Sequence, residues 1–297
     1  MTELRAEIGV FGGSGFYSLI HDAREEWIET PYGAPSDRVA LGEIAGKRVA
    51  FLPRHGKDHR FPPQAINYRA NLYAMKTLGV KWIIGPTAAG SLAKGVAPGS
   101  MVVSDQLVDR TSGRKDTFYD GPITTHVSFA DPVCPQLSGV LEEACSSAGV
   151  TAKRGGTYLC MEGPAFSTKA ESNVYRSWGM DVIGMTNLQE AKLAREAEIC
   201  YATMAMVTDY DCWHPGHDAV TVDMIVGVLL ANAEKAKALI RSVVPLLSVQ
   251  TEPCGQGCQR SLDHALITAP ERRDPELVAR LAAVAGRVLQ QKPGSGG

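Results

Sequence analysis

Two aspartates stand at the end of the apolar run 199–207, within the segment VTDYDCW. An apolar run of this length is typical of a buried strand. Asp209 and Asp211 are two residues apart, so in an extended segment their carboxyl groups point the same way. When two carboxyl groups lie close together and partly buried, the pKa of one is raised, and that acid can donate a hydrogen bond. An ordinary solvated loop fits the same residues, and the pattern favours neither interpretation.

Groups suited to binding an anion follow several other expected strands. Ser14 lies among glycines in GGSG, Arg54 and His55 lie in PRHG, and Thr87 precedes Ala88 in PTAAGS. In open α/β sheets, ligands bind beyond the carboxyl ends of the strands. Glycines allow backbone N–H groups to approach an oxyanion, and arginine supplies a fixed cationic fork. GGSG alone lacks the spacing of either nucleotide-binding loop, but the groups together predict a phosphate site.

The histidine and cysteine spacings favour no metal site. His55 and His59 are four residues apart, but Gly56 and the following FPP argue against a helix, and the glutamate of a zinc protease is missing. Cys254 and Cys258 in CGQGC lack a second pair of ligands in the sequence. A disulfide between them stays open, although a reducing compartment disfavours it.

The composition is that of an ordinary soluble protein. Of 297 residues, 44% are hydrophobic and 21% are charged, and the formal net charge is -2. This charge offers no basic patch for nucleic acid, and neither a membrane-length apolar run nor a signal peptide is visible. Seven scattered cysteines are typical of reduced thiols. We therefore expect a cytoplasmic protein without a nucleic-acid or membrane partner.

Strand and helix patterns alternate along the whole chain, which predicts an α/β fold. Two strand patterns separated by AGK predict a hairpin, so the sheet should be mixed. Without a clear linker or internal repeat, we expect one domain over residues 1–290 and a disordered tail over 291–297. Strands are expected at 6–12, 38–44, 48–54, 81–91, 101–109, 156–163, 180–186 and 199–211. Helices are expected at 66–79, 137–149, 170–179, 188–198, 221–247 and 275–291.

Motifs spread over most of the chain occur together in one known family. They are IGVFGGSGFY, RHGKDH with NYRANLYAMK, TAAGSL, DQLVDRT with FYDG, MEGPAFSTKAES, GMTNLQEAKLARE and TDYDCW. In this order, from Ile8 to Leu247, the chain resembles the 5'-methylthioadenosine phosphorylases of the trimeric purine nucleoside phosphorylase superfamily. The C-terminal part with CGQGC is poorly covered.

The resemblance implies a phosphorylase/hydrolase-like fold, with a twisted mixed central sheet flanked by helices, and a homotrimer or a dimer of trimers. It implies cleavage of the N-glycosidic bond of 5'-methylthioadenosine by inorganic phosphate, a co-substrate. The products would be adenine and 5-methylthioribose 1-phosphate, in purine and methionine salvage. Neither a metal nor an organic cofactor is implied.

The resemblance also implies roles for individual residues. Protonated Asp211 would donate to purine N7, and Asp209 would receive the exocyclic amino group. Phosphate would be held by Ser14, Arg54, His55, Thr87, the backbone of Ala88 and Asn187. The substrate pocket would contain Phe166, Met185, Val222, Ile225 and His126, the last from a neighbouring subunit. Phe166 and Met185 also fit ordinary core packing, and His126 fits a surface loop.

Ser14 and Asn187 stand where the family usually has threonine, which is expected to change phosphate affinity more than the reaction. Two other classes stay open: a nucleoside hydrolase, which would use water, and a non-catalytic nucleotide-binding protein. Within the phosphorylases, the alternative is an enzyme that prefers 5'-methylthioinosine or ordinary purine nucleosides. The sequence leaves open the relative rates on these substrates, trimer against hexamer, and the redox state of Cys254 and Cys258.

Overall fold

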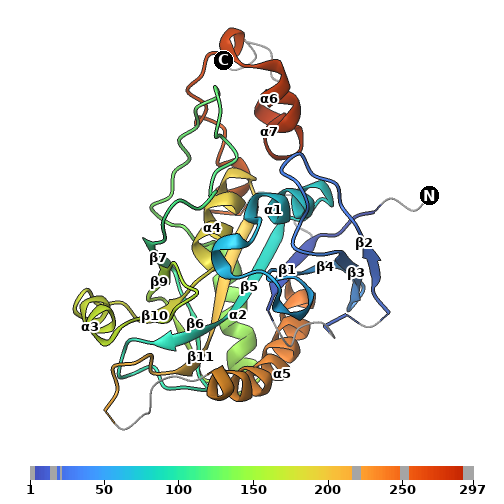
Figure 1. The fold of residues 1–297 in the computed structure, drawn as a ribbon. Coiled ribbons are helices and arrows are strands. Elements are labelled where there is room, and N and C mark those ends of the chain that lie inside the picture. Colours follow the sequence, from blue (N-terminus) through green and yellow to red (C-terminus); the bar gives the residue numbers. More distant parts are fainter. Residues whose placement is uncertain (1–3, 14–18, 21, 216–221, 248–253, 290–297) are drawn as a thin grey trace.

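The computed structural model of the chain describes residues 4–13, 19–20, 22–215, 222–247 and 254–289, with the backbone alone for 222–232. Ser14, Thr221 and the tail expected at 291–297 therefore lie outside the described residues. Strands and helices alternate as expected, and helices lie on both sides of a central sheet (Figure 1). Among the described helices, none has the length and hydropathy needed to cross a membrane.

The strands and helices have the following bounds. The strands are β1 (Ile8–Gly12), β2 (Arg24–Glu26), β3 (Val39–Ile44), β4 (Lys47–Pro53), β5 (Trp82–Ser91), β6 (Met101–Val103), β7 (Gln106–Arg110), β8 (Ala152–Arg154), β9 (Thr157–Met161), β10 (Val182–Gly184) and β11 (Cys200–Asp209). The α-helices are α1 (Tyr68–Thr77), α2 (Pro135–Ser147), α3 (Lys169–Ser177), α4 (Asn187–Glu196), α5 (Val222–Leu246), α6 (Pro275–Arg280) and α7 (Ala282–Leu289). Short 3-10 turns are η1 (Lys57–His59), η2 (Pro63–Ala65), η3 (Cys258–Arg260) and η4 (Pro270–Arg272).

The sheet is mixed, as the hairpin predicted. β3 and β4 pair antiparallel, whereas β1 lies between β4 and β5 and pairs parallel with both. β5 pairs parallel with β11 along nearly its whole length, and its last residues Gly90 and Ser91 pair antiparallel with β10. The ends of β5, β10 and β11 therefore meet at one place in the sheet.

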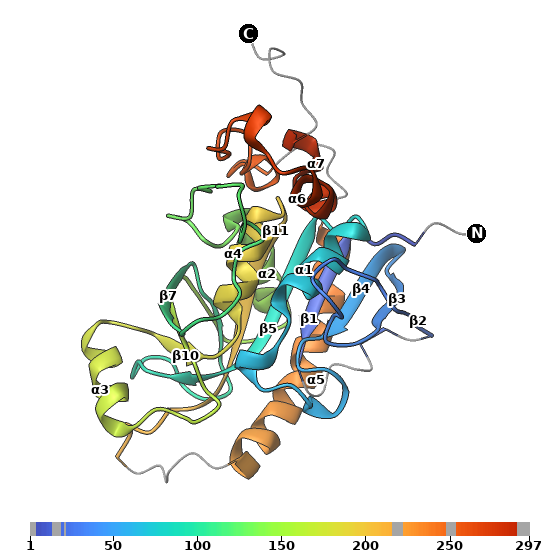
Figure 2. The same cartoon turned by 45° about the horizontal axis from the view of Figure 1, so that its top comes forward.

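Alternating side chains divide the core into layers on the two faces of the sheet. Phe11 and Ile83 pack with side chains of α1, α4 and α7, whereas their neighbours Val10 and Ile84 pack with side chains of α2 and α5. Successive residues of a strand point to opposite faces, so both faces of these strands are apolar and both need a helical layer. In both views α6 and α7 lie at one end of the molecule, and α3 lies towards the other (Figure 2).

Local signals place the helix starts. The Asn67 side chain accepts a hydrogen bond from the backbone of Ala70 at the start of α1. Thr168 and Glu171 form a reciprocal capping box at the start of α3. Each cap satisfies backbone donors that a helix start leaves unpaired. The helices expected from the apolar spacing therefore begin close to their predicted positions.

Two expectations about the elements were wrong, and two short strands were not expected. The segment 101–109 is two strands, β6 and β7, because Ser104 and Asp105 interrupt the pairing and the two parts join different neighbours. The C-terminal helix expected at 275–291 is divided into α6 and α7 at Leu281. The short strands β2 and β8 were not expected, since three residues give too little pattern to predict a strand.

Candidate functional site

Arg54 directly follows β4 and is buried, with a 1% exposed surface. Its Nε and Nη2 donate to the two carboxylate oxygens of Glu190 on α4, at 2.6 and 3.0 Å, and its Nη1 donates to the Pro86 carbonyl at 2.7 Å. Although burial opposes the charge, the Glu190 carboxylate raises the pKa of Arg54. Two of the five guanidinium N–H donors have no partner among the described residues. Arg54 is thus a rigid cation with donors left for an anion.

The strand β5 passes this cation and carries Thr87 beside it. The Thr87 hydroxyl donates to the Ala88 carbonyl oxygen at 3.2 Å. A Cβ atom on Gly85, two residues earlier, would lie 2.3 Å from the Tyr201 hydroxyl and 3.0 Å from Glu190 Oε2. Glycine at 85 therefore allows α4 and its glutamate to approach β5 closely.

Asn187 does not face an anion site. Its side chain is fully buried, and its Nδ2 donates to the Gly85 carbonyl at 2.9 Å and to the Thr203 hydroxyl. Its Oδ1 accepts a hydrogen bond from the Thr186 hydroxyl at 3.1 Å. Both N–H donors of the amide are therefore used inside the protein, and the direct phosphate contact expected for Asn187 is contradicted.

His55 lies next to Arg54 and stacks on His59, with ring centroids 4.0 Å apart and an angle of 12° between the rings. Its Nδ1 is 2.9 Å from the Phe61 carbonyl oxygen. A carbonyl only accepts, so Nδ1 carries the proton and Nε2 offers a lone pair in the neutral ring. Burial, together with the charges of His59 and Arg54, lowers the pKa of His55 to about 3. The expected donor is therefore an acceptor at neutral pH.

The two aspartates lie together, but not as residues of one extended strand. β11 ends at Asp209, and Asp211 follows it with a left-handed backbone, φ 51°. The Asp211 backbone N–H donates to Asp209 Oδ1 at 2.7 Å, and the Thr208 hydroxyl donates to Asp209 Oδ2 at 2.6 Å. A tight turn, and not strand geometry, thus brings the two carboxyl groups to the same place.

Gly90 on β5 makes room for both acids. A Cβ atom at this position would lie 3.0 Å from Asp209 Oδ1 and 3.4 Å from the Asp211 Cβ. Burial raises the pKa of Asp209, and it also raises the pKa of Asp211, to which the charge of Asp209 adds. One raised pKa was expected, and the pKa values of both aspartates are raised. Because the charge of Asp209 adds to the effect of burial on Asp211, Asp211 is the acid better able to keep its proton.

Met185 and the loop 162–168 border the region beside the aspartates. A Cβ atom on Gly163 would lie 2.6 Å from the Met185 Sδ, so the two segments touch. Phe166 in this loop has a 47% exposed surface and is not a core aromatic. Arg114 donates to the Met185 carbonyl at 2.6 Å and to the Glu162 carbonyl at 2.5 Å, which joins the two segments.

His126 lies far from the aspartates of its own chain. Its backbone N–H donates to the Ala265 carbonyl at 2.9 Å, and the residue lines a surface cavity together with Arg195, Gln256 and His264. This cavity is at the start of β11, near Cys200, whereas Asp209 ends that strand nine residues later, roughly 30 Å away. The side chains of Val222 and Ile225 lie outside the described part of the chain, as does Ser14.

Two residues of the site were not found from the sequence. Glu190 and Arg114 act through contacts between segments that are distant in the chain. Arg114 falls in the long polar segment between Arg110 and Pro135, whose unusual length was the available signal. No local pattern indicates Glu190.

The sequence of this chain matches one family of known proteins. The family model described as the phosphorylase superfamily matches residues 7–245. S-methyl-5'-thioadenosine phosphorylase of Bradyrhizobium diazoefficiens is 54% identical over 288 residues, 96% of this chain and 99% of the relative. The corresponding protein of Cereibacter sphaeroides is 51% identical and covers 97% of this chain and 100% of the relative.

Solved structures show the same fold. A methylthioadenosine phosphorylase from an Antarctic soil metagenomic library superposes with a TM-score of 0.89 at 45% identity and covers 95% of this chain and 99% of its own. A mutant adenosine/methylthioadenosine phosphorylase of Schistosoma mansoni, in complex with methylthioadenosine, has a TM-score of 0.80 at 32% identity, over 86% and 96%. The sequence matches and the shared fold show that the chain belongs to the phosphorylase superfamily, in the family of the S-methyl-5'-thioadenosine phosphorylases.

Proposed function

We propose that this protein cleaves the N-glycosidic bond of 5'-methylthioadenosine with inorganic phosphate, forming adenine and 5-methylthioribose 1-phosphate. The observation that carries the proposal is the arrangement along β5. Thr87, beside the buried Arg54, and Gly90, beside the two acids, are three residues apart, roughly 10 Å. This spacing suits a ribose held between an anion and a purine. The relatives' names supply the nucleoside.

Phosphate is proposed to bind between Arg54, Thr87 and His55, with Ser14 and the Ala88 backbone as further donors. The fixed guanidinium binds oxygen atoms that are negatively charged before and after reaction. Neutral His55 would accept a hydrogen bond through Nε2 from the P–OH group of hydrogen phosphate, which orients the nucleophile. One phosphate oxygen then attacks C1' of the ribose as the C1'–N9 bond breaks.

Asp211 is proposed to keep its proton and to donate it to purine N7 as the bond to N9 breaks. The electron pair of the broken bond goes to the purine, which leaves as neutral adenine, and Asp211 becomes a carboxylate. Asp209 would accept from the exocyclic amino group. A 6-oxopurine places a carbonyl there, which a carboxylate repels. Stabilisation of developing charge at both ends of the ribose is the main catalytic contribution.

The remaining groups are proposed to shape the nucleoside pocket. The Met185 backbone N–H would bind a ribose hydroxyl, since its carbonyl is already used by Arg114. Phe166 would lie against the base, and Val222 and Ile225 against the methylthio group. His126 would complete this pocket in a neighbouring subunit of a trimer or a dimer of trimers, because it lies far from its own aspartates. No cofactor is needed, and a cytoplasmic location stays a prediction.

The activity is tested by adding 5'-methylthioadenosine to the enzyme with and without phosphate. We expect adenine release that saturates with phosphate and stops in its absence. Equal release in phosphate-free buffer would contradict the proposal and identify a nucleoside hydrolase. No release, with the nucleoside bound, would indicate a binding protein.

Thr87→Val removes the hydroxyl that is proposed to donate to phosphate and keeps a β-branched side chain in β5. Loss of a hydrogen bond to a charged group costs about 1.5–3 kcal/mol, so the KM for phosphate should rise about 10- to 100-fold. Thr87→Ser keeps the hydroxyl and is the matched control. Arg54→Ala is less informative, because it leaves Glu190 buried and unpaired. An unchanged KM for phosphate in Thr87→Val would show that the anion binds elsewhere.

The neutral state of His55 predicts a dependence of stability on pH. The folded pKa of about 3 lies below the ordinary 6.5, so between these values the unfolded chain binds a proton that the folded chain excludes. The contribution of His55 to the free energy of unfolding is therefore complete above pH 6.5. It decreases as the pH is lowered, by at most about 1.4 kcal/mol per pH unit. Urea unfolding at about pH 7 and pH 5 should show wild type losing this stability relative to His55→Gln. An equal loss in both proteins would contradict the neutral ring; exposed His264→Gln is the control.

The proposed contribution of His126 to a neighbouring subunit's pocket predicts that the active species is at least a trimer. Sedimentation at assay concentration should show an assembly of three or six chains. His126→Ala should raise the KM for methylthioadenosine while leaving kcat less affected, since the residue contacts bound nucleoside and not the reacting atoms. A fully active monomer would exclude the shared site.

Asp211→Asn tests the reading of the base. The amide keeps the shape but lacks the acidic proton, and loss of general-acid help costs on the order of 10²–10⁴ in rate. Cleavage of methylthioadenosine should fall within that range, while methylthioinosine gains relative to it, because an amide can donate to a purine carbonyl. The measurement is kcat/KM for both nucleosides. An unchanged ratio would mean that Asp211 does not read the base; Asp209→Asn is the comparison variant.

A further inference from the structure

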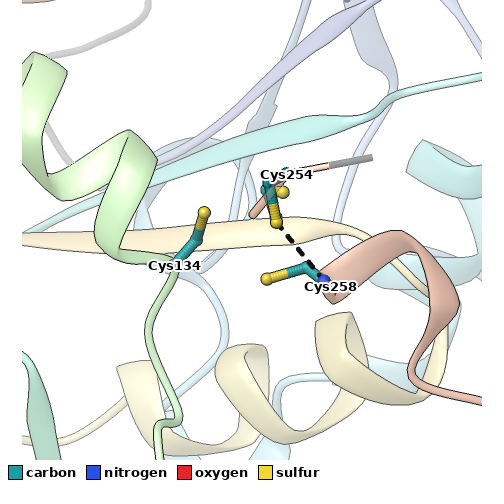
Figure 3. A group of neighbouring side chains, drawn as sticks. Cys134, Cys254 and Cys258 are labelled. Carbon is teal, nitrogen blue, oxygen red and sulfur yellow. Dashed lines mark hydrogen bonds between the residues drawn. The ribbon is translucent and has the colours of Figure 1, made fainter. Parts of the chain in front are cut away.

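Four buried cysteines from three separate parts of the chain form a cluster away from the proposed active site. Cys134 precedes α2, Cys200 begins β11, and Cys254 and Cys258 flank the turn into η3. Each has at most 3% exposed surface, and their sulfur atoms all lie within 4.8 Å of one another. Figure 3 shows the labelled side chains of Cys134, Cys254 and Cys258 directed towards a common point.

The sequence argument against a metal at CGQGC was that a second pair of ligands is missing. The fold supplies that pair as Cys134 and Cys200, which are 66 residues apart in the chain. Four thiolates at about 2.3 Å from one zinc ion stand roughly 3.8 Å from one another in a tetrahedron. The observed group needs only a small contraction to reach this geometry.

Hydrogen bonds to sulfur suit thiolate ligands. The Cys258 backbone N–H donates to the Cys254 Sγ at 3.3 Å, and the Gln259 side chain donates to the Cys200 Sγ at 3.3 Å. The Gln259 Oε1 in turn accepts from the Cys254 backbone N–H at 2.7 Å. Gln259 therefore orients ligands on two segments, as the partners around a metal centre do.

We infer that Cys134, Cys200, Cys254 and Cys258 bind one zinc ion as a closed structural site. A tetrahedral set of four sulfur ligands selects zinc or iron, and a site without an open position is structural. Binding forms four Zn–S bonds and releases the four thiol protons, with no change of oxidation state.

The ion would fasten the C-terminal segment to the start of β11. Beyond η3 this segment forms part of the cavity that contains His126, and Leu266 pairs with Thr125. Cys200 is at the opposite end of β11 from Asp209, so the ion would take no part in the chemistry. The inference holds whether or not the proposed reaction is correct.

The test is metal analysis of the full-length protein, purified without a metal-affinity column and passed through zinc-free buffer. We expect about one zinc per chain in wild type and none in Cys258→Ser, with a Tm lower by roughly 5 °C or more. Cys145→Ala is the matched control, since Cys145 is equally buried in the same core cluster but outside the group of four. It should keep its zinc.

A second measurement does not depend on the folding of a variant. After denaturation with a chelator but no reductant, all seven cysteines should be alkylated; if the four were paired as disulfides, only three would be. Cobalt added to the metal-free protein should give thiolate-to-metal charge-transfer absorption. Three outcomes would each overturn the assignment. They are a metal-free protein whose four free thiols bind no cobalt, cysteines paired as disulfides, and one equivalent of another metal.

Discussion

The site depends on one buried ion pair. The side chains of Arg54 and Glu190 are each 2% exposed, and the carboxylate also accepts a hydrogen bond from the Tyr201 hydroxyl at 2.8 Å. Breaking a buried pair by removing one partner typically costs 3–5 kcal/mol, because an uncompensated charge remains. The pair thus fixes the end of β4, the middle of β5 and the helix α4 relative to one another. Of the groups proposed to hold phosphate, Arg54, His55, Thr87 and the Ala88 backbone lie on or next to these elements.

The charges beside β5 differ between its middle and its end. A permanent cation lies beside Pro86, and two carboxyl groups whose pKa values are raised by burial lie beside Gly90. A nucleoside between them would meet phosphate on one side and a proton donor on the other. Preorganised groups of this kind stabilise developing charge without having to rearrange. Two glycines, Gly85 and Gly90, provide the close approach that both ends require.

Much of the site was predictable because its residues follow strands that are apolar and easily recognised. Arg54 and Asp209 lie at the expected ends of such strands, whereas Thr87 lies within β5, which continues to Ser91. Asp211 was predicted to lie beside Asp209 from the geometry of an extended strand, but a left-handed turn places it there. The Asn187 assignment failed because a residue at a helix start can point inward or outward, and only packing against Gly85 and Thr203 decides which.

Local patterns sufficed for most of the strands and helices, the mixed sheet and the acids at the end of β11, because burial and turn chemistry act over a few residues. Contacts between distant segments were decided by tertiary structure alone. Glu190 reaches Arg54 across 136 residues, and Cys134 and Cys200 meet Cys254 and Cys258 only when the C-terminal segment packs against β11. Spacing in the chain carries no information about such pairs, since the folded core and not the intervening residues sets their separation.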